Sequence, residues 1–410
     1  MDSFGLEVSG ASGPSLQAAN DFYVSFLGYA QFSSWKLVVD AATQHQDVPM
    51  LTLLASCYFG LSGQAALAKE AVEKVECVAP REAAYRTALE AVMVHGDLRK
   101  SYDLWVEVVR AYPTDLFACK FGQLMALLSG HGAGIHEIAA LAKPEGPLAP
   151  YWHGMVTFGL EQADQYAEAE AAARRGIQEG ADDPWLHHGF AHALYFQGPD
   201  RMQESIDFLK NKSASWSTSL HPFLYTHNWW HLALVLTEAR RFEEALDIFD
   251  TKLWPEAEMP CADKTDFQVQ MNAFGLLARL EARQQDQAQR WATVQKAGDE
   301  LVGKHADPLH DLFLLRCLCK LGRVDEAEKL LVSMQSWAEK QAARPALGTA
   351  WVPMGRAITD LFGRGDTAAG EVLLKLQPEW AVVGNSAEQR AVLVEMAQGP
   401  LVCGKPEALS

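Results

Sequence analysis

Hydrophobic residues recur every three to four positions along almost the whole chain, the spacing that places them on one face of an α-helix. Runs in which Val, Ile and Thr alternate with polar residues, as in a half-buried β-strand, are missing. Segments rich in Gly, Pro and Asp interrupt the helical pattern at residues 95–97, 112–115, 129–134, 143–147, 180–184 and 197–200. Such clusters mark turns, so the sequence predicts an all-α protein built of short helices.

The hydrophobic pattern also repeats from one helical hairpin to the next. In the clearest copy, which begins at Thr226, Trp229 and the small residues Ala233 and Ala245 take the large and small apolar positions of a tetratricopeptide repeat. The small residues let the two helices of a hairpin approach closely. Similar copies begin near three other residues: Glu82, Pro150 and Pro308.

A hairpin of this kind cannot bury its apolar face alone, so the repeats are expected to stack. We predict tetratricopeptide-like hairpins in a right-handed superhelical solenoid, one continuous array over residues 15–403, with the first helices lining a concave groove. A generic helical bundle is the alternative. Residues 1–14 and 404–410 are predicted to be flexible ends, and 212–222 and 255–265 to be loops at the rim of the groove.

The amino-acid composition limits the kinds of molecule that the protein is expected to bind. The chain has 35 Lys and Arg against 52 Asp and Glu, a net charge of −17, which argues against binding to nucleic acid or to anionic lipid. No apolar run is long enough for a membrane helix, and the first residues lack a signal-peptide pattern. Seven scattered cysteines without a C-x-x-C pair fit reduced thiols. We therefore expect a cytoplasmic protein.

Two histidine pairs are the main candidate for chemistry, since the common catalytic motifs are absent. His188 and His192 form one pair and His227 and His231 the other, each at the i, i+4 spacing that puts two imidazoles on one helix face. Such a pair can share a divalent transition metal such as zinc or iron, or can act as acid and base. A buried histidine with a hydrogen-bonded structural role is the plain alternative.

The repeat register places both histidine pairs, together with Asn228, on the groove side of two adjacent first helices. It leaves Trp229 in the core and gives Trp230 an edge toward the groove. On an earlier helix, Arg81, Arg86 and Glu90 form a charged series that is either a solvated face or an anchor for a substrate.

Several segments resemble the tetratricopeptide repeat protein 38 family. They are YPTDLFACKFG from Tyr112, YWHGMVTFGLEQ from Tyr151, DDPWLHHGFAH from Asp182, HNWWHLAL from His227 and GNSAEQR from Gly384, and the resemblance spans about residues 15–395. The residues that match the family pattern are His188, His192, His227, Asn228, His231, Asp250, Gln389 and Arg390. The resemblance implies a scaffold that holds a ligand or partner, with no named reaction.

The chain departs from that family pattern at three positions. Gln123 and Leu124 stand where the family has a His-Asp pair, and Ala391 stands where it has Asp. If those polar residues belong to a shared site, this chain has lost part of it.

Two functions follow. The first is a repeat scaffold that binds a peptide or protein in its concave groove. The second is an enzyme or metal-dependent small-molecule binder that uses the four histidines and Asp250, with Asn228, Trp230, Arg86 and Arg390 as further ligand contacts. The concentration of polar groove residues on two helices keeps the second function open.

Overall fold

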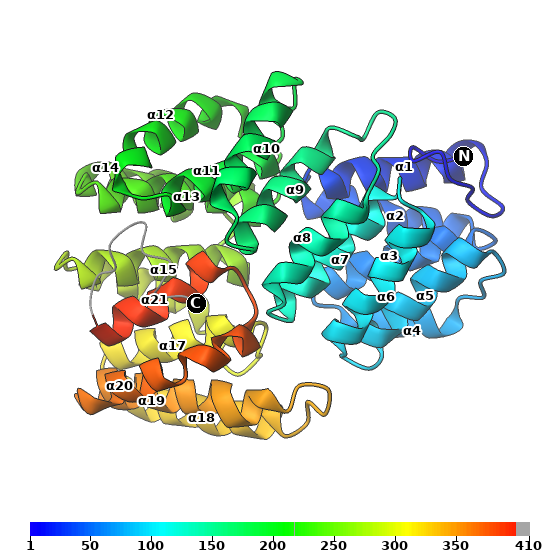
Figure 1. Cartoon of the computed structure of the whole chain (residues 1–410). Coiled ribbons are helices and arrows are strands. Elements are labelled where there is room, and N and C mark those ends of the chain that lie inside the picture. The colour runs from blue at the N-terminus through cyan, green and yellow to red at the C-terminus, as the bar shows by residue number, and fades with distance from the viewer. Residues whose placement is uncertain (217, 399–410) are drawn as a thin grey trace. The chain divides into compact units, whose positions relative to one another are not determined.

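A computed structural model describes residues 1–216 and 218–398 as an all-α protein. Contacts divide the described residues into two compact units, 1–190 with 219–221 and 191–216 with 218 and 222–398, so the boundary falls within α11 (Figure 1). The helices of the first unit are α1 Gly13–Leu27, α2 Phe32–Gln44, α3 Pro49–Leu61, α4 Ala65–Lys74, α5 Pro80–Met93, α6 Leu98–Ala111, α7 Leu116–Leu128, α8 Gly132–Leu141, α9 Tyr151–Gln162, α10 Tyr166–Gln178 and the start of α11 Pro184–Phe196.

The second unit contains the end of α11 and the helices that follow it. These are α12 Met202–Lys212, α13 Pro222–Glu238, α14 Phe242–Ile248, α15 Phe267–Ala282, α16 Ala288–Gly298, α17 Pro308–Lys320, α18 Val324–Ala338, α19 Val352–Gly363, α20 Ala368–Lys375 and α21 Ala387–Gln398. Two π-helical segments, Phe249–Leu253 and Leu347–Trp351, and short 3-10 turns at Pro199–Arg201, Ser213–Ser215, Pro260–Ala262 and Gln377–Val383 complete it.

The helix ends lie where the turn residues predict them. The segment 112–115 separates α6 from α7, and 180–184 leads into α11. Asp97 and Asp115 cap α6 and α7, because their carboxylates accept hydrogen bonds from the backbone N–H groups of Lys100 and Ala118. The predicted helix–turn–helix rhythm is confirmed.

From α1 to α10 each helix packs on the next, and α3 and α7 also contact α5 and α9, as in stacked hairpins. Helix α1 packs not only on α2 but also on α7, which lies much later in the chain. Phe22 and Phe26 of α1 lie with ring centroids 5.9 and 5.0 Å from that of Phe117. An aromatic core therefore joins α1 to a hairpin far along the chain.

The N-terminal residues pack more closely than a frayed end would. Asp2, Phe4 and Val8 are buried, and the Asp2 carboxylate lies 2.6 Å from a guanidinium nitrogen of Arg81. Arg81 also pairs with Asp115, so this arginine is neither a solvated residue nor a groove anchor. The other predicted end, residues 404–410, lies outside the described residues.

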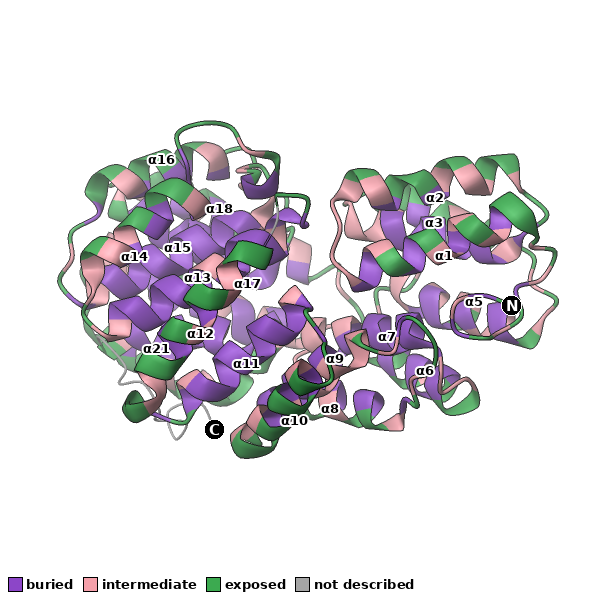
Figure 2. Ribbon diagram, turned by 90° about the horizontal axis from the view of Figure 1, so that it is seen from above, coloured by how far each residue is buried: buried purple, intermediate pink, exposed green. Residues whose placement is uncertain are grey.

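In the second unit α13, α15, α17 and α19 contact one another in chain order, and α14, α16 and α18 complete their hairpins. The buried residues of this unit gather along α13, α15 and α17 (Figure 2). Helix α21 returns to pack on α15 (Figure 1). These stacked hairpins confirm the predicted helical-repeat solenoid.

The two predicted loops contain short turns and buried residues. Segment 212–222 includes the turn Ser213–Ser215 and an isolated bridge between Leu220 and Ala30. In segment 255–265, Cys261 and Ala262 are buried in a turn that packs on α13. Their placement at the rim of a binding groove stays a prediction.

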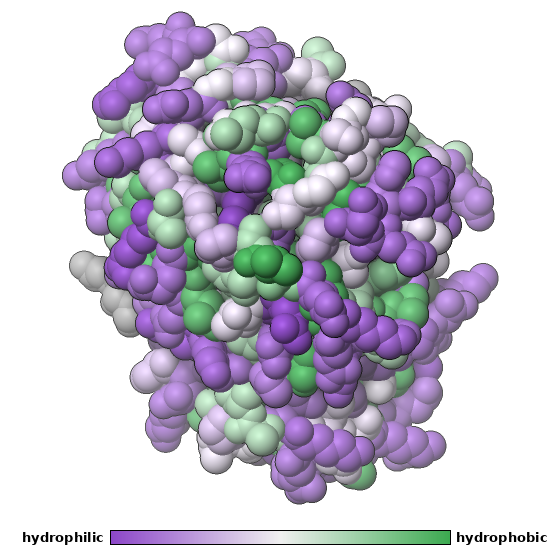
Figure 3. Space-filling view, turned by 90° about the vertical axis from the view of Figure 1, so that its right-hand side faces the viewer, coloured by the Kyte–Doolittle hydropathy of each residue, from purple (hydrophilic) through white to green (hydrophobic). Residues whose placement is uncertain are grey.

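Hydrophilic residues cover most of the face drawn in Figure 3, and hydrophobic residues appear there in small separate groups. Among the described helices, none has the length and apolar character needed to span a membrane.

Candidate functional site

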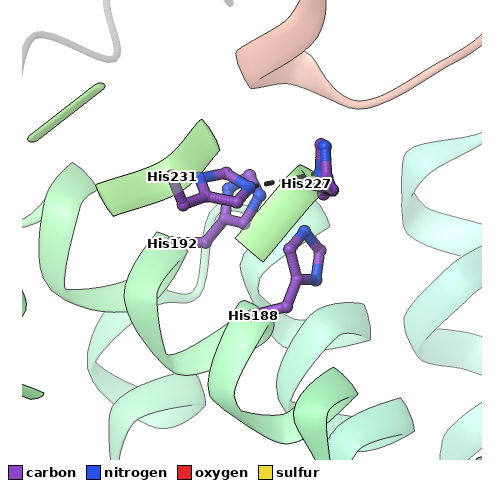
Figure 4. A group of neighbouring side chains, drawn as sticks. All are labelled: His188, His192, His227 and His231. Atoms are coloured by element: carbon purple, nitrogen blue, oxygen red, sulfur yellow. Dashed lines mark hydrogen bonds between the residues drawn. The ribbon is translucent and has the colours of Figure 1, made fainter. Parts of the chain in front are cut away.

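The four histidines of the two predicted pairs come together from α11 and α13 (Figure 4). Each offers one ring nitrogen to a group in which these atoms lie within 4.8 Å of one another. His192 and His231 have ring centroids 4.2 Å apart, and those of His227 and His231 are 4.6 Å apart. The two pairs, which the repeat register placed on adjacent helices, therefore converge.

The surroundings of the cluster differ from an open groove. His188, His192, His227 and His231 are all buried, none more than 4% exposed. Asn228, which the register placed on the groove side, is buried as well. Nearly every position of α13 is buried, so its polar side chains must find partners inside the protein.

Hydrogen bonds fix the orientation of His227. Thr226 donates to the Pro222 carbonyl at 2.8 Å, and the Asn272 amide nitrogen donates to the Thr226 hydroxyl oxygen at 3.0 Å. The amide oxygen of Asn272 is thereby turned toward Nδ1 of His227, 2.8 Å away, and accepts its proton. His227 Nε2 is left without a proton, and it faces Nε2 of His231 at 3.2 Å.

Burial also keeps His227 neutral. Its pKa is lowered from 6.5 to about 3, chiefly by burial, while the bond to Asn272 raises it and nearby His192 lowers it. Since only neutral imidazole can donate a lone pair to a metal ion, His227 is ready for ligation across the physiological pH range.

A buried ionic network lies beside the cluster, on α13, α15 and α21. Arg279 of α15 bonds Glu388 of α21 at 2.8 Å, and Arg283 bonds Glu395 of α21 at 2.7 Å and also pairs with Glu238 of α13. Burial raises the pKa of Glu388, whereas Arg279 and His192 lower it. A carboxylate of α21 therefore lies in the electrostatic field of His192.

The first unit holds a separate buried pair that the sequence did not single out. Lys120 of α7 lies with its Nζ 3.8 Å from the ring centroid of Trp185 and 4.6 Å from that of Tyr29. Asp183, at the start of α11, has one buried carboxylate oxygen without a hydrogen bond. Burial lowers the pKa of Lys120 and raises that of Asp183. Trp185 also stacks on His188, with ring centroids 4.4 Å apart.

The other predicted site residues lie apart from the metal-ligand group. Asp250 is half exposed in the π-helical segment Phe249–Leu253 and pairs with Arg290. Arg86 donates to the Val72 carbonyl within the first unit. Arg390 donates to the carbonyls of Gly384 and Asn385 ahead of α21. Each of the three has a local structural partner.

The structure corrects the predicted exposure of Trp230. Trp230 has no edge on a groove: it is 1% exposed, stacks on His227 with centroids 5.0 Å apart, and lies beneath the Arg279 guanidinium. Trp229, expected in the core, is only half-buried and contacts Trp216 and Lys252. The other apolar positions of the register on this helix, Leu232, Ala233 and Leu236, are buried as predicted.

Sequence reasoning missed Asn272, Arg279 and Glu388. Asn272 sits on α15, for which no repeat copy was identified, and nothing in its local sequence marks it. Glu388 falls within the segment GNSAEQR that carried the family resemblance, next to the matched residues Gln389 and Arg390. That segment was the one available signal for α21.

A comparison with protein families matches residues 313–337 to the PPR repeat. The matched segment covers the later part of α17 and most of α18, a hairpin of the second unit. The tetratricopeptide repeat protein 38 family stays an interpretation of the residues quoted above. What the match and the fold together establish is that this chain is a helical-repeat protein.

Proposed function

We propose that this helical-repeat protein binds a divalent transition metal ion, zinc or iron, through His192, His227 and His231, with His188 as fourth ligand. The convergence of their ring nitrogens within 4.8 Å carries the proposal. Imidazole ligands select zinc, iron and copper over calcium and magnesium, which prefer oxygen.

The spacing of the nitrogens suits a tetrahedral ion. Two ligand atoms on a zinc ion with bonds of 2.0 to 2.1 Å lie about 3.3 Å apart. The Nε2 atoms of His227 and His231 are separated by 3.2 Å. An ion could therefore bridge this pair with small movements of the rings, in place of the hydrogen bond that they share.

The hydrogen bonds around His227 support this proposal. Histidines that ligate metals usually donate their other ring N–H to a fixed acceptor, which sets the tautomer. Asn272 supplies that acceptor, and Thr226 holds the Asn272 amide in place. The burial of the set favours an ion that stabilises the fold or holds a small ligand.

Metal content tests this proposal. Protein purified without a histidine tag and dialysed against metal-free buffer should retain about one zinc or iron per chain by mass spectrometry. Cobalt loaded into the apoprotein should give the visible absorption of a tetrahedral ion. A chelator should lower the melting temperature, because an ion bound only to the folded state stabilises it by mass action.

Variants assign the ion to the cluster. His227→Gln and His231→Gln should lose the retained metal and the cobalt spectrum. His95→Gln is the matched control, since the His95 side chain is 60% exposed and lies on the first unit. Wild-type protein that neither retains metal nor shifts in melting temperature with added zinc would leave the histidines as structural residues.

A second candidate function, peptide binding, rests on a groove in the first unit. A hollow of about 710 Å³ lies over α2, α3 and α4 and is lined by apolar residues, among them Val39, Phe59 and Leu67, with Glu70 and Lys74 at its side. A short amphipathic helix is the peptide that such a groove would accept. Peptides selected against the protein should lose affinity in Phe59→Ser and keep it in Val332→Ser, a change at an exposed apolar residue of α18.

RNA is a weaker candidate. PPR arrays read one base per repeat, whereas the match here covers one hairpin. A net charge of −17 opposes attraction to phosphates.

A further inference from the structure

A serine, a histidine and an aspartate of the second unit form a hydrogen-bonded line away from the histidine cluster. Nδ1 of His305 lies 2.7 Å from a carboxylate oxygen of Asp311, and its Nε2 lies 2.8 Å from the Ser333 hydroxyl. His305 is in the loop before α17, Asp311 is on α17, and Ser333 is on α18. We propose that Ser333 is the nucleophile of a Ser–His–Asp site that hydrolyses carboxylic esters.

The direction of the hydrogen bonds is the one that nucleophilic catalysis needs. When the Asp311 carboxyl is ionised it can only accept, so it takes the Nδ1 proton in its hydrogen bond, and Nε2 then carries the lone pair that accepts the proton of the Ser333 hydroxyl. A serine inside a helix more often bonds a backbone carbonyl one turn back. Here the hydroxyl is directed at the imidazole, as in an activated serine.

The three side chains differ in solvent exposure, as the members of a Ser–His–Asp triad do. Asp311 is fully buried, His305 is 8% exposed, and Ser333 is partly exposed, so Ser333 is the residue of the three that lies nearest to solvent. The second carboxylate oxygen of Asp311 is buried and has no hydrogen bond. The carboxylate therefore directs its hydrogen bonding to His305.

The loop that carries His305 is strained and firmly held. The φ angle of His305 is +52°, a left-handed backbone conformation that is unfavourable for a residue other than glycine. Asp307 caps α17, the Asn385 amide donates to the Asp307 carboxylate, and the Trp351 indole N–H donates to the Pro308 carbonyl at 2.8 Å. These contacts keep the imidazole in place against Ser333.

The backbone of the same loop approaches the nucleophile at Gly303. A Cβ built on Gly303 would lie 3.7 Å from the Ser333 hydroxyl oxygen, and the φ angle there is +77°. Within the described residues, the N–H of Gly303 takes no part in the backbone hydrogen bonds of the loop. It is therefore a candidate donor for the oxyanion of an acyl-transfer intermediate.

The reaction balances with water as the only co-reactant. The Ser333 oxygen attacks the ester carbonyl while His305 takes its proton, the bond to the leaving alcohol breaks, and His305 returns the proton to that alcohol. Water then attacks the acyl-serine, again through His305, and releases the carboxylic acid and the free serine.

Labelling of the full chain by a fluorophosphonate probe tests the proposal. Mass spectrometry of the wild-type protein should place one adduct on Ser333, and the protein should hydrolyse p-nitrophenyl acetate. Ser333→Ala should abolish both, and Asp311→Asn should lower the labelling rate at least about 100-fold, since the wrong histidine tautomer impairs such sites severely. Ser213→Ala, which removes an exposed hydroxyl bonded to the Lys210 carbonyl, should change neither.

Folding and metal content are controlled separately. Each variant is compared by circular dichroism and melting temperature, and the wild-type measurement is repeated with a chelator, which should leave labelling unchanged. Folded wild-type protein without an adduct on Ser333, or with an adduct that forms equally fast in folded Asp311→Asn, would overturn the proposal. The three residues would then only tie the loop to its hairpin.

Discussion

Asn272 controls the proton on His227 although the two residues stand 45 positions apart in the chain. Without an acceptor at Nδ1, the ring could place its proton on Nε2 and remove the lone pair that a metal requires. At the scale of single residues, the cluster therefore depends on an amide that is not a ligand itself.

Asn272→Ala should weaken zinc binding by about 10- to 100-fold, the usual effect of losing the support of a ligating histidine. Competition with a chromophoric chelator measures the affinity. Thr237→Ala is the control, because the Thr237 hydroxyl bonds the Ala233 carbonyl on the same helix, away from the cluster. Equal zinc affinities for Asn272→Ala and the wild type would contradict this role.

At the scale of elements, α21 is held on α15 by buried charges. A buried arginine left without its carboxylate is far more costly than loss of the whole pair. Glu388→Leu should therefore destabilise the protein by about 3 to 5 kcal/mol, and addition of Arg279→Met should recover most of this loss. Urea unfolding of the two single variants and the double variant measures the coupling.

An exposed ion pair calibrates that measurement. Arg356 and Glu328 have side chains 44% and 31% exposed, so Arg356→Met should cost at most about 1 kcal/mol. If the double variant at Arg279 and Glu388 were as unstable as the sum of the single variants, the pair would not hold α21 as described.

The same network predicts a pH effect at Glu238. Burial raises the pKa of this carboxyl from 4.5 to about 7, against the opposing effect of Arg283. Between these values the folded protein keeps a proton that the unfolded chain releases, so this contribution to stability is present at low pH and is lost as pH rises to about 7. Each unit of the shift corresponds to about 1.4 kcal/mol.

Glu238→Gln cannot take up this proton. Melting temperatures of wild type and variant at pH 5, 6, 7 and 8 should show the wild type losing stability relative to the variant up to about pH 7. Parallel curves over this range would mean that Glu238 is ionised throughout.

The helix boundaries and the pairing of the histidines could be predicted because neighbouring residues in the sequence determine them. Turn residues at 95–97 and 112–115 set helix ends, and the i, i+4 spacing put each histidine pair on one face. The exposure of Trp229 and Trp230 was not predictable, because α13 is buried on nearly all sides and no single face of it is solvated. Asn272 and Glu388 reach the site through tertiary packing, which no local pattern encodes.

At the scale of the whole molecule, the boundary between the two compact units falls inside α11, a continuous helix. A helix interior resists proteases because its backbone is hydrogen-bonded. If the repeats form one array, limited proteolysis should cut within 212–222, within 255–265 and at the chain ends. Early cleavage between residues 184 and 196 into two stable fragments would show that the units fold independently.

Trp230 gives the histidine cluster an optical reporter. Its indole stacks on the ring of His227, with planes 18° apart and centroids separated by 5.0 Å. Paramagnetic ions such as copper(II) quench indole fluorescence at short range. A copper(II) ion bound to His227 should therefore quench the fluorescence of Trp230. The difference between wild type and Trp230→Phe would isolate its signal from the other 11 of the chain's 12 tryptophans, and a titration in a fluorimeter could then follow metal entry in real time.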